Sequence, residues 1–90
     1  MNRAFSKPEC PDGCTVKQLN NNTAWVITYP DDKKVLISYS TPVMVMFRDG
    51  TAFRLWNGST ATTWKHIRAF SGYSADEYRQ LDLINPRSVM

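Results

Sequence analysis

The sequence contains a single histidine, His66, and only two cysteines, Cys10 and Cys14. A structural zinc site ordinarily uses four Cys or His ligands, so these three residues are too few to form one. With one imidazole available and no catalytic signature around either cysteine, we find no candidate for nucleophilic catalysis. We therefore expect no catalytic residue, no metal site and no cofactor. A disulfide between Cys10 and Cys14 is geometrically possible across the turn between them, but in a reducing cytosol we expect two free thiols.

Long apolar runs and blocks of like charge are also missing. No segment approaches the roughly 20 apolar residues of a membrane-spanning helix, and residues 1–7 are not followed by the apolar stretch of a signal peptide. These features predict a cytoplasmic protein without membrane contact. The net charge of +3 is mild and falls short of the basic stripe that is typical of nucleic-acid-binding proteins.

The sequence is, by contrast, rich in aromatic side chains, with three Trp, four Tyr and four Phe. This content argues against disorder, and 90 residues are enough for one independently folding domain. Pro8 and Pro11 interrupt the first residues. We therefore predict an irregular amino-terminal arm over residues 1–14, a single domain over residues 15–85 and a frayed tail over residues 86–90.

Five segments rich in β-branched and aromatic residues are separated by short polar turns. They cover residues 15–19, 24–29, 35–39, 43–47 and 52–56. Short connections favour pairing between strands that are consecutive in the sequence. The predicted fold class is α+β, with a four- to five-stranded antiparallel meander sheet packed by one or two C-terminal helices.

The first predicted helix covers residues 60–70 and ends at Ser71 and Gly72. Its apolar face has helical spacing, and Lys65 and Arg68 lie on the opposite, solvated side. The residues predicted to face the sheet are Thr63, Trp64, Ile67 and Phe70.

The second predicted helix begins with a capping box formed by Ser74 and Glu77. Asn85 and Pro86 are expected to end it, because the residue before proline disfavours helical geometry. Tyr78, Leu81 and Ile84 then share one helical face.

The pair Asp49 and Gly50 predicts a hairpin with a two-residue type I′ turn. In that register one face of the hairpin carries Met44, Met46, Phe53 and Leu55. The other face carries Val43, Val45, Phe47, Ala52, Arg54 and Trp56. Both faces are largely apolar, and we expect the Arg54 and Trp56 face to be the exposed one, because an unpaired arginine is costly to bury.

Two segments carry a resemblance to a family. Residues 36–43 read Leu-Ile-Ser-Tyr-Ser-Thr-Pro-Val, and residues 61–67 read Ala-Thr-Thr-Trp-Lys-His-Ile. An aliphatic-Ser-Tyr-x-Thr-x-Val segment followed by Thr-Thr-x-x-His resembles a family of small uncharacterised proteins encoded by tailed phages and mobile elements. The resemblance covers roughly residues 35–70. It implies a phage or prophage accessory protein and brings no catalytic residue with it.

The polar residues offer little chemistry. We expect His66 to bond a neighbouring strand or water, with Thr62 within reach one turn earlier. The carboxylates all lie at predicted turns or helix caps, which explains them without acid–base catalysis. They are Asp31, Asp32, Asp49, Asp76, Glu77 and Asp82. The sequence therefore predicts a protein that is not an enzyme.

Three functional hypotheses follow. The first is a phage-type accessory factor that binds a host protein or defence complex, since interface cores favour Trp, Tyr, Met and Arg. The second is nucleic-acid binding, with basic side chains on phosphates and aromatic rings on bases. The third is a homo-oligomer such as a dimer. The predicted contact residues are Arg48, Arg54, Trp56, Lys65 and Arg68.

Overall fold

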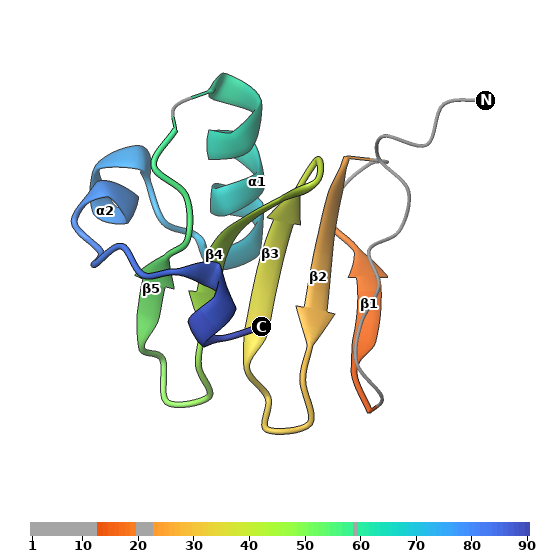
Figure 1. Ribbon diagram of the computed structural model, residues 1–90. Helices are drawn as coiled ribbons and strands as arrows, with labels where there is room; N and C mark the ends of the chain where they lie inside the picture. Colours follow the sequence, from red (N-terminus) through yellow and green to blue (C-terminus); the bar gives the residue numbers. More distant parts are fainter. Residues whose placement is uncertain (1–12, 20–22, 59) are drawn as a thin grey trace.

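The computed structural model describes residues 13–19, 23–58 and 60–90, which form one antiparallel sheet with the two α-helices on one side (Figure 1). The strand order is β1-β2-β3-β4-β5, so the predicted α+β meander is confirmed. The strands are β1 (Thr15–Gln18), β2 (Ala24–Thr28), β3 (Lys34–Ser38), β4 (Thr41–Met46) and β5 (Ala52–Arg54). The helices are α1 (Ala61–Ser71), α2 (Ala75–Arg79) and the short 3-10 helix η1 (Pro86–Ser88). Most of the predicted amino-terminal arm, including Cys10, lies outside the described residues.

The turn between β4 and β5 has three loop residues instead of the predicted two. The Phe47 N–H donates to the Thr51 carbonyl (2.8 Å), and the Gly50 N–H donates to the Phe47 carbonyl (3.0 Å). A type I′ turn needs a positive φ at both central residues, but here Gly50 has one (92°) and Asp49 does not. The predicted turn type is wrong because the Asp49 carboxylate accepts the Thr51 N–H (2.9 Å) and stabilises a wider turn.

The extra loop residue shifts the register of the hairpin by one. Met46 pairs with Ala52, and Val45 pairs with Phe53. A shift of one residue moves side chains of one strand to the opposite face, so the predicted faces of the hairpin are wrong. Val45, Phe53 and Leu55 pack on one side of the sheet, and Met44, Met46, Ala52 and Trp56 pack on the other.

The turn between β2 and β3 has the same form. The Tyr29 N–H donates to the Lys33 carbonyl (2.9 Å), and the Asp32 N–H donates to the Tyr29 carbonyl (2.9 Å). Asp32 thus occupies the position that Gly50 takes in the other turn, and its φ is also positive (71°). The two turns lie side by side at one end of the sheet, where Arg48 Nε is 3.8 Å from an Asp32 carboxylate oxygen.

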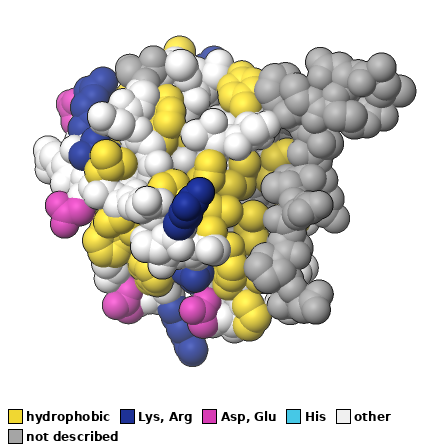
Figure 2. Space-filling model, viewed as in Figure 1, with side chains coloured by type: hydrophobic (Ala, Val, Ile, Leu, Met, Phe, Trp, Pro, Cys, Tyr) yellow, Lys and Arg dark blue, Asp and Glu magenta, His cyan; other side chains and the backbone are white. Residues whose placement is uncertain are grey.

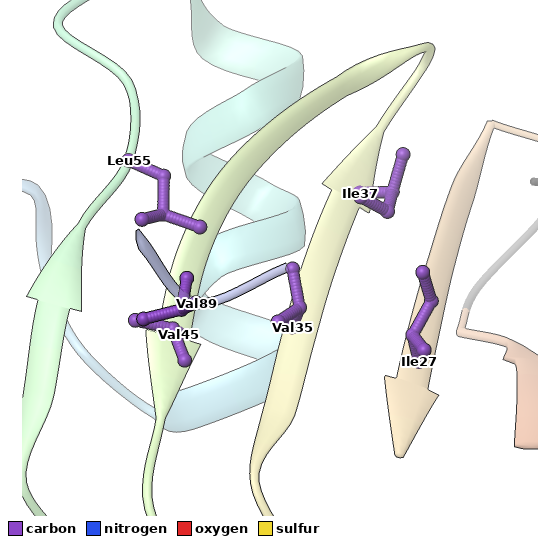
Figure 3. Close-up of a cluster of buried hydrophobic side chains, with 6 residues drawn as sticks. All are labelled: Ile27, Val35, Ile37, Val45, Leu55 and Val89. Carbon is purple, nitrogen blue, oxygen red and sulfur yellow. The ribbon is translucent and has the colours of Figure 1, made fainter. Parts of the chain in front are cut away.

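The two faces of the sheet are covered differently. The back face, behind β3 and β4 in Figure 1, packs against α1 and α2 through Leu36, Val43, Met44, Ile67 and Tyr78. The front face carries a second buried cluster, in which the carboxy-terminal Val89 lies over the strands (Figure 3). That cluster consists of Ile27, Val35, Ile37, Val45, Leu55 and Val89. The predicted exposure of the Arg54 and Trp56 face is therefore wrong, since this is the face that the helices cover.

Helix α1 has the predicted ends. The Thr60 side chain accepts the Thr63 N–H at the amino terminus, and Gly72 takes a left-handed conformation (φ 82°) at the carboxy terminus. The buried side chains are Thr63, His66 and Ile67. Trp64 and Phe70, predicted to be buried, are half-buried and pack at the border of the back cluster.

Helix α2 is shorter than predicted. The capping box of Ser74 and Glu77 is present, but the helix ends at Arg79. The chain then runs along the outer edge of β5, where the Arg54 N–H donates to the Asp82 carbonyl (2.8 Å) and the Ile84 N–H donates to the Arg54 carbonyl (2.9 Å). These bonds to a strand edge replace the helical bonds that the spacing of apolar residues predicts.

The carboxy-terminal residues form η1 and pack on the sheet, whereas the sequence predicts a frayed tail. Asn85 caps η1 by accepting the Arg87 N–H, and Val89 is only 9% exposed. Ile84 packs against the front cluster, whereas Leu81 packs against the back cluster. The chain therefore crosses the edge of the sheet between these two residues, which a continuous helix does not allow.

Candidate functional site

The five predicted contact residues do not form one surface. Arg48 is exposed in the β4–β5 turn, and Lys65 and Arg68 are exposed on α1 behind the sheet. Arg54 is used internally, because its Nε–H donates to the Leu81 carbonyl (2.7 Å) and fixes the segment after α2. Its role in the structure is thus to stabilise the fold.

Trp56 belongs to an aromatic cluster between the sheet and the helices. Its ring centroid lies 5.8 Å from that of Trp64, which in turn lies 5.6 Å from that of Tyr78. The Tyr78 hydroxyl is within hydrogen-bond distance of the carbonyls of Val43 (2.6 Å) and Trp56 (2.9 Å). The Arg79 guanidinium covers Trp64 at 5.2 Å. Trp56 is therefore half-buried and held rigidly, with part of its surface left for contact.

A set of half-buried aromatic side chains lies on the front of the sheet, which α1 and α2 leave uncovered. We call it the front aromatic surface: Trp25, Tyr29, Phe47 and Phe53. Figure 2 shows hydrophobic side chains gathered across this side of the molecule. The alternation of side chains along β2 predicts from the sequence that Trp25 and Tyr29 share a face, and in the structure both lie on the front. The predicted hairpin register is wrong by one residue and therefore places Phe53 on the other side.

The rings of this surface have fixed neighbours. Phe47 and Phe53 meet edge to face with centroids 5.9 Å apart, and the Lys33 ammonium lies 4.3 Å from the Tyr29 ring centroid. The buried Nε1–H of Trp25 has no hydrogen-bond partner in the described part of the chain. Buried donors are nearly always paired, so an unpaired one marks a place where an acceptor would be stabilised.

Basic and acidic groups alternate at the turn end of this surface. Arg48 lies beside Asp32, with Asp31 and Asp49 on the same two turns. Hydrogen bonds from Thr51 hold the pKa of Asp49 below its usual range, so this carboxylate is charged at neutral pH. The lower rim of the molecule in Figure 2 accordingly shows both signs of charge.

A second polar site joins β3 to α1. His66 is 1% exposed, and both of its ring nitrogens have hydroxyl partners. Nδ1 lies 2.8 Å from the Ser38 hydroxyl, and Nε2 lies 3.2 Å from the Thr23 hydroxyl. The expectation that His66 bonds a neighbouring strand is confirmed. Thr62 is exposed on α1, and the helical residue that joins this network is Thr63.

The network extends from His66 to the amino-terminal cap of α1. The Thr60 hydroxyl accepts the Thr63 N–H and donates to the Thr63 hydroxyl (2.8 Å). The Thr63 hydroxyl lies 3.3 Å from the Ser38 hydroxyl, and either of the two can donate. Ser38 in turn lies within hydrogen-bond distance of His66 Nδ1 (2.8 Å), so each ring nitrogen of His66 has one hydroxyl partner.

This network is poorly suited to base catalysis. Burial lowers the pKa of His66, which means that the surroundings disfavour the imidazolium that a general base must become. Both partners of the ring are neutral hydroxyls, and neither supplies a negative charge that would stabilise the protonated ring. The geometry thus favours a structural or binding role for the Ser38–His66 pair.

A small pocket of about 200 Å³ opens beside this network. We call it the hydroxyl pocket, and its walls come from the β3–β4 turn, the segment after β5 and the first turn of α1. It is lined by Ser38, Tyr39, Thr41, Val43, Trp56, Thr60 and Thr63. Several of these residues belong to the two sequence segments of the resemblance described above, which the fold brings together although they are about 20 residues apart.

Tyr39 holds the pocket's turn in an unusual conformation. Its φ is positive (59°), a region that bulky side chains rarely adopt. The Tyr39 N–H donates to the Thr23 carbonyl (2.6 Å), and its ring centroid lies 5.9 Å from that of His66. Strained residues of this kind are concentrated at functional sites, where surrounding contacts maintain them.

The described residues contain no cluster of three or more His, Cys, Asp or Glu side chains that could hold a metal ion. Within the same part of the chain, every helix is too short or too polar to cross a bilayer.

Comparison with known proteins finds one relationship. Neither the curated proteins nor the solved structures contain a match to this chain. One family model, described as a family of unknown function (DUF8033), matches residues 14–85. That range includes all five strands, α1 and α2. The chain therefore belongs to the DUF8033 family.

Proposed function

We propose that this protein acts by binding a partner protein through the front aromatic surface, and that it does not catalyse a reaction. The observation that carries this proposal is the set of four half-buried aromatic rings on the side of the sheet opposite α1 and α2. Rings of this kind dominate the energy of protein interfaces because each buries a large area at low entropic cost.

The surface has further features of an interface. The edge-to-face contact of Phe47 with Phe53 and the ammonium of Lys33 on Tyr29 hold these side chains in place before a partner arrives. Preorganised side chains lose less entropy on binding. The Nε1–H of Trp25, which has no hydrogen-bond partner among the described residues, is a donor that a partner's carbonyl could satisfy.

The likeness of residues 35–70 to proteins of tailed phages extends the proposal. In this reading the protein is a phage-type accessory factor, and the partner is a host protein or defence complex in the cytoplasm of the host cell. The proposal does not depend on that origin, since the aromatic surface fits any partner with a complementary apolar patch.

Nucleic-acid binding is the second candidate function. Aromatic rings on the open side of a sheet can stack on unpaired bases, and Lys33 and Arg48 could contact phosphates. The carboxylates of Asp31, Asp32 and Asp49 lie at the same end and would repel a phosphate backbone. The alternation of charges therefore favours a protein partner.

The test compares two variants in a pull-down from host lysate. Tyr29→Ala with Phe47→Ala alters the front aromatic surface, and Lys65→Ala with Arg68→Ala alters the exposed side of α1. We expect the first variant to lose a saturable partner and the second to keep it, with circular dichroism confirming that both fold. The reverse result would assign binding to α1, and capture of no partner by the unaltered chain would contradict the proposal.

Two additional measurements separate the alternatives. Titration with single-stranded DNA and RNA at several salt concentrations tests the second candidate, because phosphate contacts make affinity fall steeply with salt. Sedimentation equilibrium of the purified chain tests whether the partner is a second copy. If the unaltered chain forms a dimer and the Tyr29→Ala, Phe47→Ala variant does not, the partner is a second copy of this chain and not a host protein.

A further inference from the structure

The final residues of the sequence cross the front of the sheet, on the same side as the front aromatic surface (Figure 1). We call residues 85–90 the strap, and it contains the short helix η1. Val89 is the one buried side chain of the strap, and Pro86 is half-buried. The other side chains of the strap are exposed. The strap is therefore attached to the sheet mainly through Val89.

The hydrogen bonds of the strap are internal within the part of the chain that the structure describes. Each bond of its short helix has both donor and acceptor within residues 85–90. The acceptors are Asn85 and Pro86, and the donors are Arg87, Ser88, Val89 and Met90. The bond that precedes the strap runs from the Ile84 N–H to the Arg54 carbonyl (2.9 Å) at the edge of the sheet. The strap can therefore leave the described part of the sheet without breaking a hydrogen bond, by a rotation of the chain after Ile84.

Val89 lies over aliphatic side chains that are buried beneath it. In Figure 3 it lies among Val35, Val45 and Leu55, which come from β3, β4 and the segment after β5. These three side chains are at most 6% exposed while the strap is in place. The four rings of the front aromatic surface pack against the same cluster. Lifting the strap would therefore join the aliphatic area to the aromatic rings in one continuous surface.

Such an opening is local, because the rest of the fold does not depend on the strap. The back cluster and the pairing of the five strands include no residue of the strap. A region with few buried apolar contacts opens at a lower free energy than the whole protein unfolds. Opening of the strap therefore leaves the sheet, α1 and α2 intact.

We propose that the strap is an autoinhibitory closure of the front aromatic surface, and that the partner binds the open form, in which Val89 has left its site. This inference rests on the proposed function, because it concerns the same surface. The closed strap reduces the apparent affinity for the partner in proportion to the fraction of chains that are open. A partner that fills the site of Val89 binds the open form better and shifts the population toward it.

The lining beneath Val89 limits the chemistry of the partner. Val35, Val45 and Leu55 have no side-chain hydrogen-bonding group. A polar or charged group placed among them would lose its water without gaining a hydrogen bond, which is costly. The segment of the partner that replaces Val89 therefore carries an aliphatic or aromatic side chain at that place.

The first experiment needs no partner and measures opening in the full chain by methyl relaxation dispersion. Val89→Ser removes the anchoring side chain and leaves the hydrogen bonds of the strap in place, since none of them uses the Val89 side chain. We expect the open population to rise at least roughly tenfold, the factor that corresponds to the burial of one valine. The exchange should affect the methyl groups of Val35, Val45 and Leu55.

Reference groups and further variants separate opening from general loosening. The methyl groups of Leu36 and Ile67 in the back cluster should show no added exchange. Val89→Ala should give the same pattern with a smaller increase. Arg87→Ala, at an exposed residue of the strap, is the matched control and should leave the open population unchanged.

The second experiment tests whether the opened area belongs to the front aromatic surface. The probe is 8-anilinonaphthalene-1-sulfonate, a dye that binds exposed hydrophobic surface. Val89→Ser should bind more dye than the unaltered chain, and adding Tyr29→Ala with Phe47→Ala should reduce that binding. In the pull-down, Val89→Ser should reach half-saturation with about tenfold less chain, because more of it is open.

The results support or overturn the proposal as follows. Exchange confined to the front methyl groups, together with dye binding that needs the front rings, supports it. The absence of methyl exchange in Val89→Ser, equal exchange in both clusters, or equal capture of a partner by Val89→Ser and the unaltered chain would overturn it. If neither chain captures a partner, the proposed function fails, and the methyl and dye measurements still decide whether the strap opens.

Discussion

The Ser38 hydroxyl lies 2.8 Å from His66 Nδ1, and this contact joins the end of β3 to the middle of α1. It is the point where the two sequence segments of residues 36–43 and 61–67 meet. The pair connects the only histidine in the chain to the hydroxyl network beside the pocket.

Acid should destabilise the fold through His66. Burial lowers its pKa from the ordinary 6.5, so the folded state binds fewer protons than the unfolded state. The stabilisation is fully present above about pH 6.5 and decreases as the pH falls toward the lower folded pKa, by at most about 1.4 kcal/mol per pH unit. Urea unfolding from about pH 8 to about pH 5 measures this slope. His66→Gln should flatten it, and an equal slope in both proteins would contradict the prediction.

Arg54 should matter for stability, although the sequence suggests a contact role. Arg54→Met keeps the apolar stem and removes the donor to the Leu81 carbonyl, which should lower the free energy of unfolding by about 1.5–3 kcal/mol. Hydrogen exchange of the Ile84 N–H, which bonds to the Arg54 carbonyl, should become faster. Arg48→Met is the control, and as an exposed substitution it should change stability by less than about 0.5 kcal/mol.

Tyr78 should anchor α2 to the sheet. Tyr78→Phe leaves the Val43 and Trp56 carbonyls without their hydroxyl partner and should cost about 1–3 kcal/mol of unfolding free energy. Burial also raises the pKa of Tyr78 above the ordinary 10.0, so its stabilisation is present below that pH and is lost as the pH rises further. Thermal unfolding should therefore show a steeper alkaline loss in the unaltered chain than in Tyr78→Phe. Tyr73→Phe, a half-buried tyrosine nearby in the sequence, serves as the control.

The two equivalent turns should respond oppositely to substitution. Gly50→Ala places a side chain at a φ of 92° with nothing within 4 Å of its Cβ, so its cost of about 1–2 kcal/mol comes from the backbone alone. Asp32→Gly relieves a positive φ of 71° and should stabilise by up to about 1 kcal/mol, less the small loss of its ion pair with Arg48. Chemical denaturation of the two variants checks the opposite signs. Destabilisation by Asp32→Gly would show that the ion pair outweighs the strain.

Local patterns were sufficient for most elements of the fold. Alternation places Trp25 and Ile27 on one face of β2 and Val26 on the other, as the two clusters confirm. The helix caps at Thr60 and Ser74 could also be read from the sequence, because a cap depends on residues within one turn of it. Such features need no knowledge of distant contacts.

The candidate site was harder to predict. Of the five expected contact residues, Arg54 is used within the fold, and Arg48 lies far along the sheet from the hydroxyl pocket. The front aromatic surface was missed in part because one loop residue changes the face of Phe53. The sequence does contain a signal for the correct register. A three-residue hairpin loop needs a positive φ at its last residue, and Gly50 is the residue in this turn that has one.

By itself, the sequence determined the class of the fold, the order of its elements and the ends of α1, because these depend on propensities and spacing along a few consecutive residues. The tertiary structure decided which face of the β4–β5 hairpin the helices cover, where α2 ends and which polar groups meet. These outcomes depend on bonds between residues far apart in the chain, such as Arg54 with Leu81 and Ser38 with His66. Their energies compete with local preferences of similar size, and only the assembled sheet determines which prevail.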